Sequence, residues 1–207
     1  MRQRRVLLVV TVCLLAVLAP HTSAVAATAD ATKSAKVPQA GISLRYPAAW
    51  AIVPLTQKDL EAQIKLLSKK NPKLADAMNS AGSDAIAQQM KFRAQDLTGG
   101  ASNVGVQALR GRGPASLDDF TSVIAGEYKT IGATVLDTSE QRVSGTPGYR
   151  ADVSLTVTLP GESSTTARLG QLIVQNGSKL AIVTAASEDS AAGEQVIDQI
   201  LGSVRLL

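Results

Sequence analysis

The chain has 207 residues, with 21 lysines and arginines against 17 acids and a formal charge of +4. Its six aromatic residues are few for a surface that stacks bases, and its basic residues are scattered along the chain instead of clustered. Because nucleic-acid binding depends on a clustered basic surface, the composition argues against a nucleic-acid partner.

Residues 1–26 have the three parts of a secretory signal peptide. A basic start, with Arg2, Arg4 and Arg5, is followed by an apolar run over 6–18 and a small-residue exit at 24–26. We expect cleavage after Ala26 and a secreted or extracytoplasmic protein. The 13-residue apolar run is short for a membrane span, which needs about 20 residues, so no stable membrane anchor is expected.

The only cysteine and the only histidine, Cys13 and His21, lie inside this leader. Cleavage would leave 18 basic and 17 acidic residues and neither of those two side chains. A chain without thiols and imidazoles cannot form a disulfide, a Ser-His-Asp triad or a zinc site built from cysteine and histidine. The sequence therefore predicts a non-enzymatic protein with no cofactor and no metal.

The mature chain is expected to consist of a tether followed by a domain that begins at Gly41. Residues 27–40 are small, polar and non-periodic, which predicts a flexible tether, and residues 41–207 are expected to form one domain. Alternation over 42–46, a break at Pro47 and a second apolar stretch over 50–53 predict two short strands.

Three helices are expected between residues 56 and 132. Thr56 and Asp59 form a capping box before a helix that ends near Lys70, and Asn71-Pro72 predicts a second helix up to Gly82. After a strand over 103–109, Ser116 is the expected N-cap of a helix that Gly132 ends.

From Thr134 onward the pattern is almost entirely that of strands. Residues 134–143, 149–159, 169–175 and 179–186 are the predicted strands, and Asn176-Gly177 predicts a tight hairpin between the last two. These two strands are apolar on both faces, so we expect them in the middle of a sheet that is covered on each side. A final helix starts near Ser190.

The order of these sequence motifs resembles that of the PsbP-like superfamily, and within it that of the exported bacterial LpqN-type branch. The resemblance rests on GISLRYPAAW, Asn103-Val104, VSGTPGYRADVSL and the QLIVQNGSKLAIVTAAS hairpin before a helix that ends ILGSVRL. It implies an α+β fold, a PsbP-like α/β/α sandwich, in which an antiparallel sheet of about six strands carries helices on both faces. Relatives serve as accessory subunits, as a binder of the Ran GTPase and as envelope lipoproteins, so the resemblance implies little about activity. Two marks of some relatives, a lipidated cysteine at the end of the leader and metal-binding histidines, are absent here.

Two acidic pairs, Asp118-Asp119 and Glu188-Asp189, are candidates for catalytic carboxylates, but both lie where a helix begins. We interpret them as charges that favour a helix N-terminus, with a weak calcium contact at Glu188 or Asp189 as an alternative.

Two further sets of residues are candidates for binding. Arg110 and Arg112 lie in an Arg-Gly-Arg-Gly loop that either holds an anion or a partner or is a solvated turn. Tyr46 and Trp50 either belong to the core or line a small apolar groove.

The leading hypothesis is a secreted accessory or binding domain of the bacterial envelope or exterior that holds a protein partner. The alternative is a carrier of a small apolar molecule or lipid, with a cleft between helices and sheet. A hydrolase that works with carboxylates alone is a third hypothesis.

Overall fold

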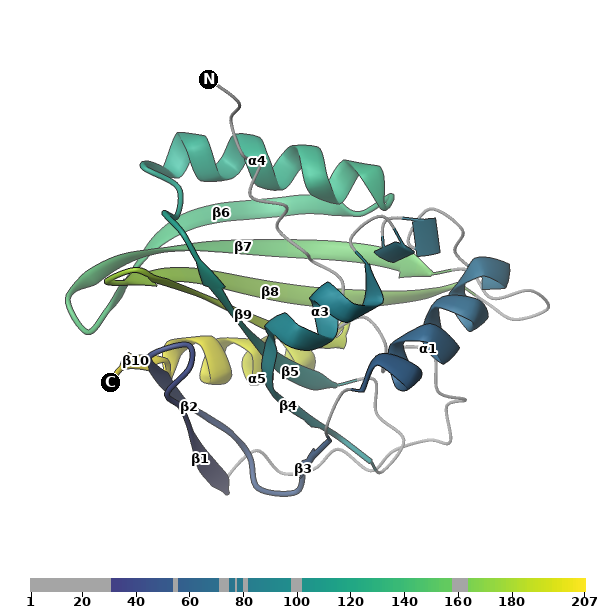
Figure 1. Cartoon of the computed structure of the whole chain (residues 1–207), viewed down its shortest axis with the longest axis horizontal. Coiled ribbons are helices and arrows are strands. Elements are labelled where there is room, and N and C mark those ends of the chain that lie inside the picture. Colours follow the sequence, from purple (N-terminus) through teal and green to yellow (C-terminus); the bar gives the residue numbers. More distant parts are fainter. Residues whose placement is uncertain are drawn as a thin grey trace.

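The computed structural model describes residues 31–53, 56–70, 75–76, 78–79, 82–97, 102–157 and 164–207. Its strands are β1 (Thr32–Val37), β2 (Ile42–Pro47), β3 (Ala51–Ile52), β4 (Met90–Gln95), β5 (Asn103–Arg110), β6 (Thr134–Val143), β7 (Thr146–Val157), β8 (Thr165–Asn176), β9 (Lys179–Glu188) and β10 (Arg205–Leu206). Its helices are α1 (Gln57–Lys70), α3 (Ser83–Gln89), α4 (Leu117–Thr130) and α5 (Ala191–Gly202). This is an α+β architecture (Figure 1).

The strands form two antiparallel sheets. The large sheet has seven strands in the order β3-β4-β5-β9-β8-β7-β6, and the small sheet has three in the order β1-β2-β10. The hairpin from β8 to β9 turns at residues 177–178, one position later than predicted, with Asn176 paired to Lys179 and Gly177 at a φ of 60°. Eleven of the buried core residues come from these two strands, which explains their position in the middle of the large sheet.

Helices α1, α3 and α4 cover one face of the large sheet. Their fully buried Leu60, Ile86, Phe120, Ile124 and Tyr128 share one apolar cluster with side chains of β7, β8 and β9. In Figure 1, α4 runs along the β6 side of the sheet, while α1 and α3 lie toward the other side. This layer confirms the helical cover expected on the first face.

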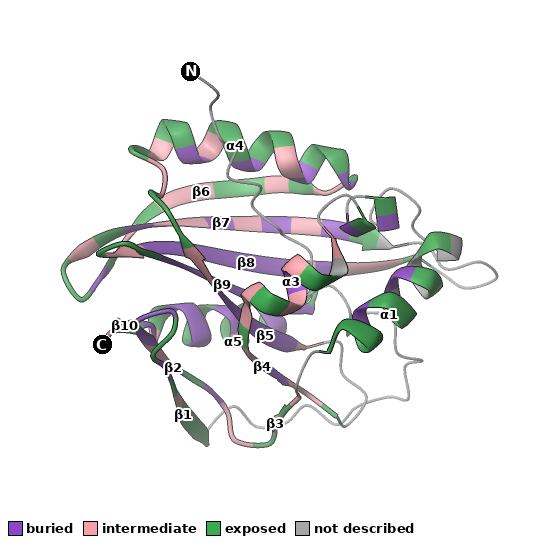
Figure 2. Ribbon diagram, viewed as in Figure 1, coloured by how far each residue is buried: buried purple, intermediate pink, exposed green. Residues whose placement is uncertain are grey.

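Helix α5 and the small sheet cover the opposite face. Ile197, Ile200 and Leu201 of α5 join Ile42 and Leu44 of β2 in a second apolar cluster, which also includes inward residues of β5, β8 and β9. Figure 2 shows how buried residues concentrate along β8, β9 and the sheet-facing side of α5. The predicted cover on both faces is confirmed, although a second sheet supplies part of it.

The expected single sheet of about six strands is wrong in number and arrangement. The strand expected over 50–53 is confirmed as β3, whereas β10 has two residues, too few for an alternating pattern to be recognised. Strand β2 is predicted correctly, but it belongs to the small sheet, where it pairs with β1 and β10, and not to the large sheet. Of the predicted helix over 72–81, the structure describes 75–76 and 78–79, which are helical, and the rest lies outside the described residues.

The tether expected over 27–40 is also wrong where the structure describes it. Thr32–Val37 forms β1, in register with β2 from the pair Thr32 and Pro47 to the pair Val37 and Ile42. Only Ala35 and Val37 turn apolar side chains toward the core, and the remaining residues are exposed and polar. A strand with so little apolar surface has the composition of a linker, so its sequence does not reveal it.

The predicted helix caps are confirmed by their hydrogen bonds. The Oγ atoms of Ser116 and Ser190 each accept a hydrogen bond from the backbone N–H three residues on, at 3.1 Å in both cases. At the start of α1, the Asp59 carboxylate accepts from the Thr56 hydroxyl at 2.6 Å and from the Thr56 backbone N–H at 3.0 Å. These reciprocal contacts satisfy donors that a helix N-terminus leaves unpaired.

We predict an acid-sensitive capping box at Asp59. Hydrogen bonds from the Thr56 side chain and then from its backbone hold the pKa of Asp59 below its usual value. The contribution to stability is therefore fully present above a pH of about 4 and lost as the pH falls through the lowered pKa. NMR titration should show the low Asp59 pKa in the native chain and a higher one in Thr56→Val; an unchanged pKa in the variant would contradict the assignment.

A second prediction uses one chemical change at two glycines. A Cβ at Gly170 of β8 would overlap Ile197 Cγ2 and lie 2.8 Å from Leu201 Cδ1, so Gly170→Ala should lower the free energy of unfolding by about 1–3 kcal/mol. Gly126 lies in the exposed face of α4 with no atom within 4 Å of such a Cβ, so Gly126→Ala should raise it by about 0.5–1 kcal/mol. Urea unfolding measures both, and equal effects of the two changes would refute the packing assigned to α5.

Candidate functional site

A groove of about 820 Å³ lies between the small sheet and the C-terminal half of α5; we call it the α5–β2 groove. Its lining is rich in hydroxyl groups and carries two guanidinium groups. The polar side chains concerned are Thr32, Ser34, Ser43, Ser203, Arg45 and Arg205. The groove is open to solvent on the outer side of the molecule and is therefore suited to an extended surface ligand.

Ser203, the C-cap of α5, joins the helix to β2. Its Oγ accepts from the Arg45 backbone N–H at 2.7 Å and donates to the Ile200 carbonyl at 2.7 Å. The Arg205 guanidinium turns back to the end of the same helix, where Nη1 donates to the Gly202 carbonyl at 2.8 Å and to the Val204 carbonyl at 2.7 Å. A cation at the C-terminus of a helix is favoured by the helix dipole, so Arg205 has a fixed place at the groove.

The small sheet is positively charged and has no acid of its own. Residues 31–53 and 199–207, which supply all three strands, contain Lys33, Lys36, Arg45 and Arg205 but no aspartate or glutamate. Lys36 and Arg205 both pair with Ser43 of β2, one from each side, and Arg45 lies two residues further along. Lys36, Arg45 and Arg205 therefore share one face of the sheet.

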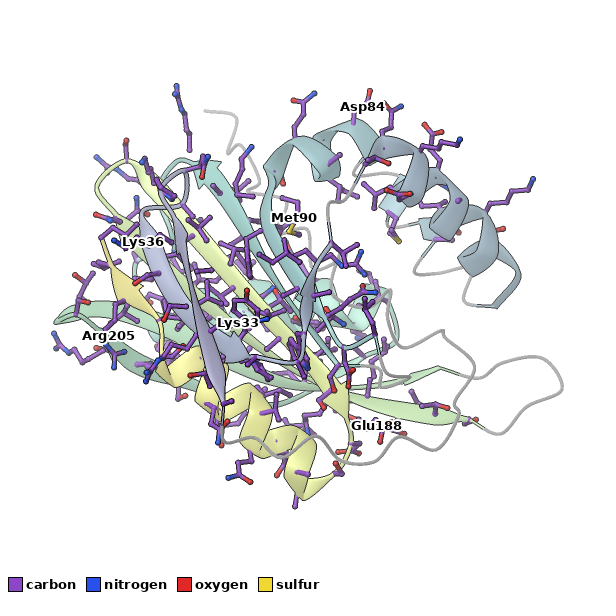
Figure 3. All side chains as sticks on the ribbon, turned by 90° about the horizontal axis from the view of Figure 1, so that it is seen from below. Lys33, Lys36, Asp84, Met90, Glu188 and Arg205 are labelled. Carbon is purple, nitrogen blue, oxygen red and sulfur yellow. The ribbon has the colours of Figure 1, made fainter. Side chains whose placement is uncertain are left out.

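Figure 3 shows Lys33 and Lys36 on β1 and Arg205 on β10 at one side of the molecule, whereas the labelled acids Asp84 and Glu188 lie elsewhere. All four basic side chains of the small sheet are exposed. Within the described part of the chain, none of them forms an ion pair with a carboxylate. The positive charge of this sheet is thus available to a ligand.

The acids next to the groove are already engaged. Asp198, at its rim, accepts from Arg150 Nη2 at 2.6 Å, and Arg150 also makes a bidentate contact with Asp152 at 2.7 and 3.0 Å. Burial alone would lower the pKa of Arg150, but the hydrogen bonds that its guanidinium donates to Asp152 and Asp198 outweigh burial and raise the pKa. Arg168 similarly contacts Asp189 at 3.3 Å and also Glu194.

These two ionic clusters fix α5 to β7 and β8, because Asp198 and Glu194 belong to the helix and Arg150 and Arg168 to the strands. A hollow of about 260 Å³ lies between them and is lined by the same charged groups. Since each arginine is matched by two carboxylates, we assign these clusters a structural role.

The predicted loop arginines, Arg110 and Arg112, lie exposed at the end of β5, and the structure does not bring them to the groove. The backbone N–H of Gly111 donates to the Ser178 carbonyl at 3.3 Å, and that of Gly113 donates to Gln175 Oε1 at 2.7 Å. Both glycine amides of the motif are therefore used within the protein. Anion or partner binding by the two arginines stays a prediction.

Tyr46 and Trp50 lie in the apolar cluster of the second face, each 4% exposed. The Tyr46 ring packs against Phe92, with ring centroids 5.4 Å apart. Tyr46 also forms part of the wall of the α5–β2 groove, and Trp50 does not.

The acidic pairs lie where helix capping requires them. Asp118 and Asp119 are in the first turn of α4, and Asp189 immediately precedes the N-cap of α5 and pairs with Arg168. Among the residues that the structure describes, no three His, Cys, Asp or Glu side chains lie together as a metal site would require. None of the described helices is long and apolar enough to cross a membrane.

Comparison with known proteins gives no match to a family model and no match to a curated protein. Among solved structures, cyanobacterial PsbP (CyanoP) from Synechocystis sp. PCC 6803 aligns over 90% of this chain and 98% of its own, with a TM-score of 0.54 and 13% identity. The chain has the PsbP-like fold. The resemblance deduced from the sequence is thereby confirmed at the level of the fold.

Two further solved structures are similar over most of the chain, also at low sequence identity. LpqN, described as involved in cell envelope biogenesis of Mycobacterium tuberculosis, aligns over 86% of each chain with 12% identity and a TM-score of 0.49. The Ran-binding protein Mog1p of Saccharomyces cerevisiae aligns over 85% of this chain and 95% of its own, with 8% identity and a TM-score of 0.48.

We predict that Arg150 is a structural residue and Arg112 is not. Arg150→Gln leaves the partly buried Asp152 without its bidentate partner, which should lower the free energy of unfolding by about 1–3 kcal/mol. Arg112→Gln changes an exposed side chain in a loop and should have an effect within about 0.5 kcal/mol. Thermal unfolding of both variants is the measurement, and a neutral Arg150→Gln would remove the role assigned to the ionic cluster.

Proposed function

We propose that this chain is an exported, non-enzymatic binding domain that holds a protein partner on its small sheet, at the α5–β2 groove. The observation that carries the proposal is the contrast between two sets of charged residues. Arg150 and Arg168 are each matched by two carboxylates, whereas Lys36, Arg45 and Arg205 share a face with no acid of the small sheet opposite them.

This contrast supports binding because an exposed cluster of like charges does not stabilise the fold. Cations on neighbouring strands repel one another, so the arrangement costs some stability unless an anionic group lies between them. A partner with negative charge would remove that repulsion on binding and would be guided to the surface by it. Fixed hydroxyls of the groove would supply hydrogen bonds in addition.

Export and the absence of catalysis are supported by the sequence and the fold. The leader-like segment over 1–26 favours export, and the mature chain would lack the thiol and imidazole groups of the usual nucleophiles and bases. The PsbP-like fold is in keeping with an accessory role, although fold alone does not define function.

The apolar carrier, the alternative function, stays a prediction without a supporting observation. It needs an open apolar cleft between the helices and the sheet. Leu60, Met78 and Ile86 are fully buried in the same cluster as the strand residues of that face, so these side chains pack against the sheet instead of leaving it free.

The test is affinity capture from culture fluid and solubilised envelope with three purified forms of the chain. We expect a protein that is captured by the native chain and lost from the Arg45→Glu, Arg205→Glu double variant. The Arg110→Glu, Arg112→Glu double variant changes charge equally but away from the groove, and it should retain that protein.

Two results would contradict the proposal. Loss of the partner only from the Arg110 and Arg112 variant would place binding at the loop after β5. Equal capture by all three forms would show that neither set of arginines takes part. Circular dichroism of each variant provides the control for folding.

A further inference from the structure

We infer that the partner contributes an extended acidic segment, which adds as a new strand to the free edge of β1 and places its carboxylates on the basic side chains of the small sheet. This inference rests on the proposed function and specifies the class of partner and its mode of binding.

The direction of one hydrogen bond shows which backbone groups of β1 are free. The Arg45 N–H points away from β1, because it donates to Ser203 Oγ on the α5 side. Alternation along β2 then directs the backbone of Leu44 and Tyr46 toward β1, where they pair with Ala35 and Lys33. The backbone N–H and C=O groups of Thr32, Ser34 and Lys36 must therefore point outward.

Strand β1 is an edge strand, since the small sheet has the order β1-β2-β10 and no further described strand lies beside β1. Five of its six residues are exposed or half-buried, as Figure 2 shows by its colour. An outward row of donors and acceptors, unpaired among the described residues, is the template to which an extended peptide adds in strand addition.

The charge of the edge selects an acidic peptide. Lys33 and Lys36 lie on opposite faces of β1, and Arg45 lies opposite Ser34 on the next strand. In an added strand, side chains lie directly beside those of β1, so an acid on the outer face would meet Lys36. Strand β2 lies one strand further away, about 10 Å from the added strand, so an acid opposite Ser34 would be reached by Arg45 only through its long side chain. Two copies of β1 would instead bring lysines together in any register, which disfavours self-pairing.

The other edges of the large sheet are less suited. Strand β3 has only two residues, and β6 is interrupted by an irregularity between Val135 and Asp137. Strand β6 also carries its own ion pair, with Arg142 Nε 3.8 Å from Glu140 Oε1. Strand β1 is regular over all six residues and carries charge of one sign.

The first experiment uses three peptides of about six residues, the length of β1, that alternate threonine with glutamate, glutamine or lysine. We expect the glutamate peptide alone to bind and to protect the amide hydrogens of Thr32, Ser34 and Lys36 from exchange, as followed by NMR. The same peptide with N-methyl groups on all its amides, which cannot donate a hydrogen bond to β1 from either edge, should not protect them.

A matched pair of variants separates backbone pairing from charge. Ser34→Pro removes an outward N–H without removing a β1–β2 bond, and it should weaken binding of the glutamate peptide by about tenfold or more. Ser34→Ala removes the same hydroxyl but keeps that N–H, so it should bind the glutamate peptide clearly more tightly than Ser34→Pro does. Exchange protection of the Lys33 and Ala35 amides reports whether β1 remains paired in each variant.

The outcomes distinguish this inference from the proposed function. If the captured partner is lost from the Arg45 and Arg205 variant but kept by Ser34→Pro, the groove binds its partner without strand addition and this inference is wrong. Equal binding of the glutamate and glutamine peptides would remove the charge argument. Binding to phosphatidylglycerol vesicles without binding of the glutamate peptide would replace the inference by a membrane contact.

Discussion

The structure depends on burial of both faces of the β8–β9 hairpin. Leu172 and Val174 point to one side of the large sheet while Leu169 and Ile173 point to the other, and all four are buried. Because apolar side chains on both faces lose their contact with water only under two covering layers, the helices α1, α3 and α4 and the layer of α5 and β2 are both required. The α5–β2 groove lies in this second layer. It exists because helix α5 and the small sheet do not fill the space where they meet.

Much of this arrangement follows from local patterns. The caps at Thr56, Ser116 and Ser190 and the hairpin after Asn176 depend on residues within a few positions of each other, and the structure confirms each of them. The small sheet depends on pairings that carry no such signal. Strand β1 pairs with its neighbour β2 but has little apolar surface, and β10 has two residues whose partners in β2 lie more than 160 positions away. The sequence therefore predicts a tether in place of β1 and does not reveal β10.

The candidate site was missed for a related reason. Arg110 and Arg112 attract notice because a Gly-x-Gly motif surrounds them, yet its amides bond to Gln175 and Ser178. The groove, in contrast, combines Arg45 and Arg205 from opposite ends of the chain, and neither lies in a motif. The sequence does contain one indication of the basic surface, because residues 31–53 and 199–207 include no acid. This indicates a binding surface only when the two segments are known to be neighbours.

The pairing of β2 with both β1 and β10 has a consequence for how the chain folds. Ile42 and Ser43 lie between strands that are separated by more than 160 positions in the sequence, so closing this sheet carries a large loss of chain entropy. On a ribosome, β1 and β2 can form a hairpin early, but their apolar side must wait for α5 and Arg205–Leu206 to be made. During synthesis the hairpin therefore remains without its core, and the apolar side chains of Leu44 and Tyr46 stay exposed until the C-terminal residues follow.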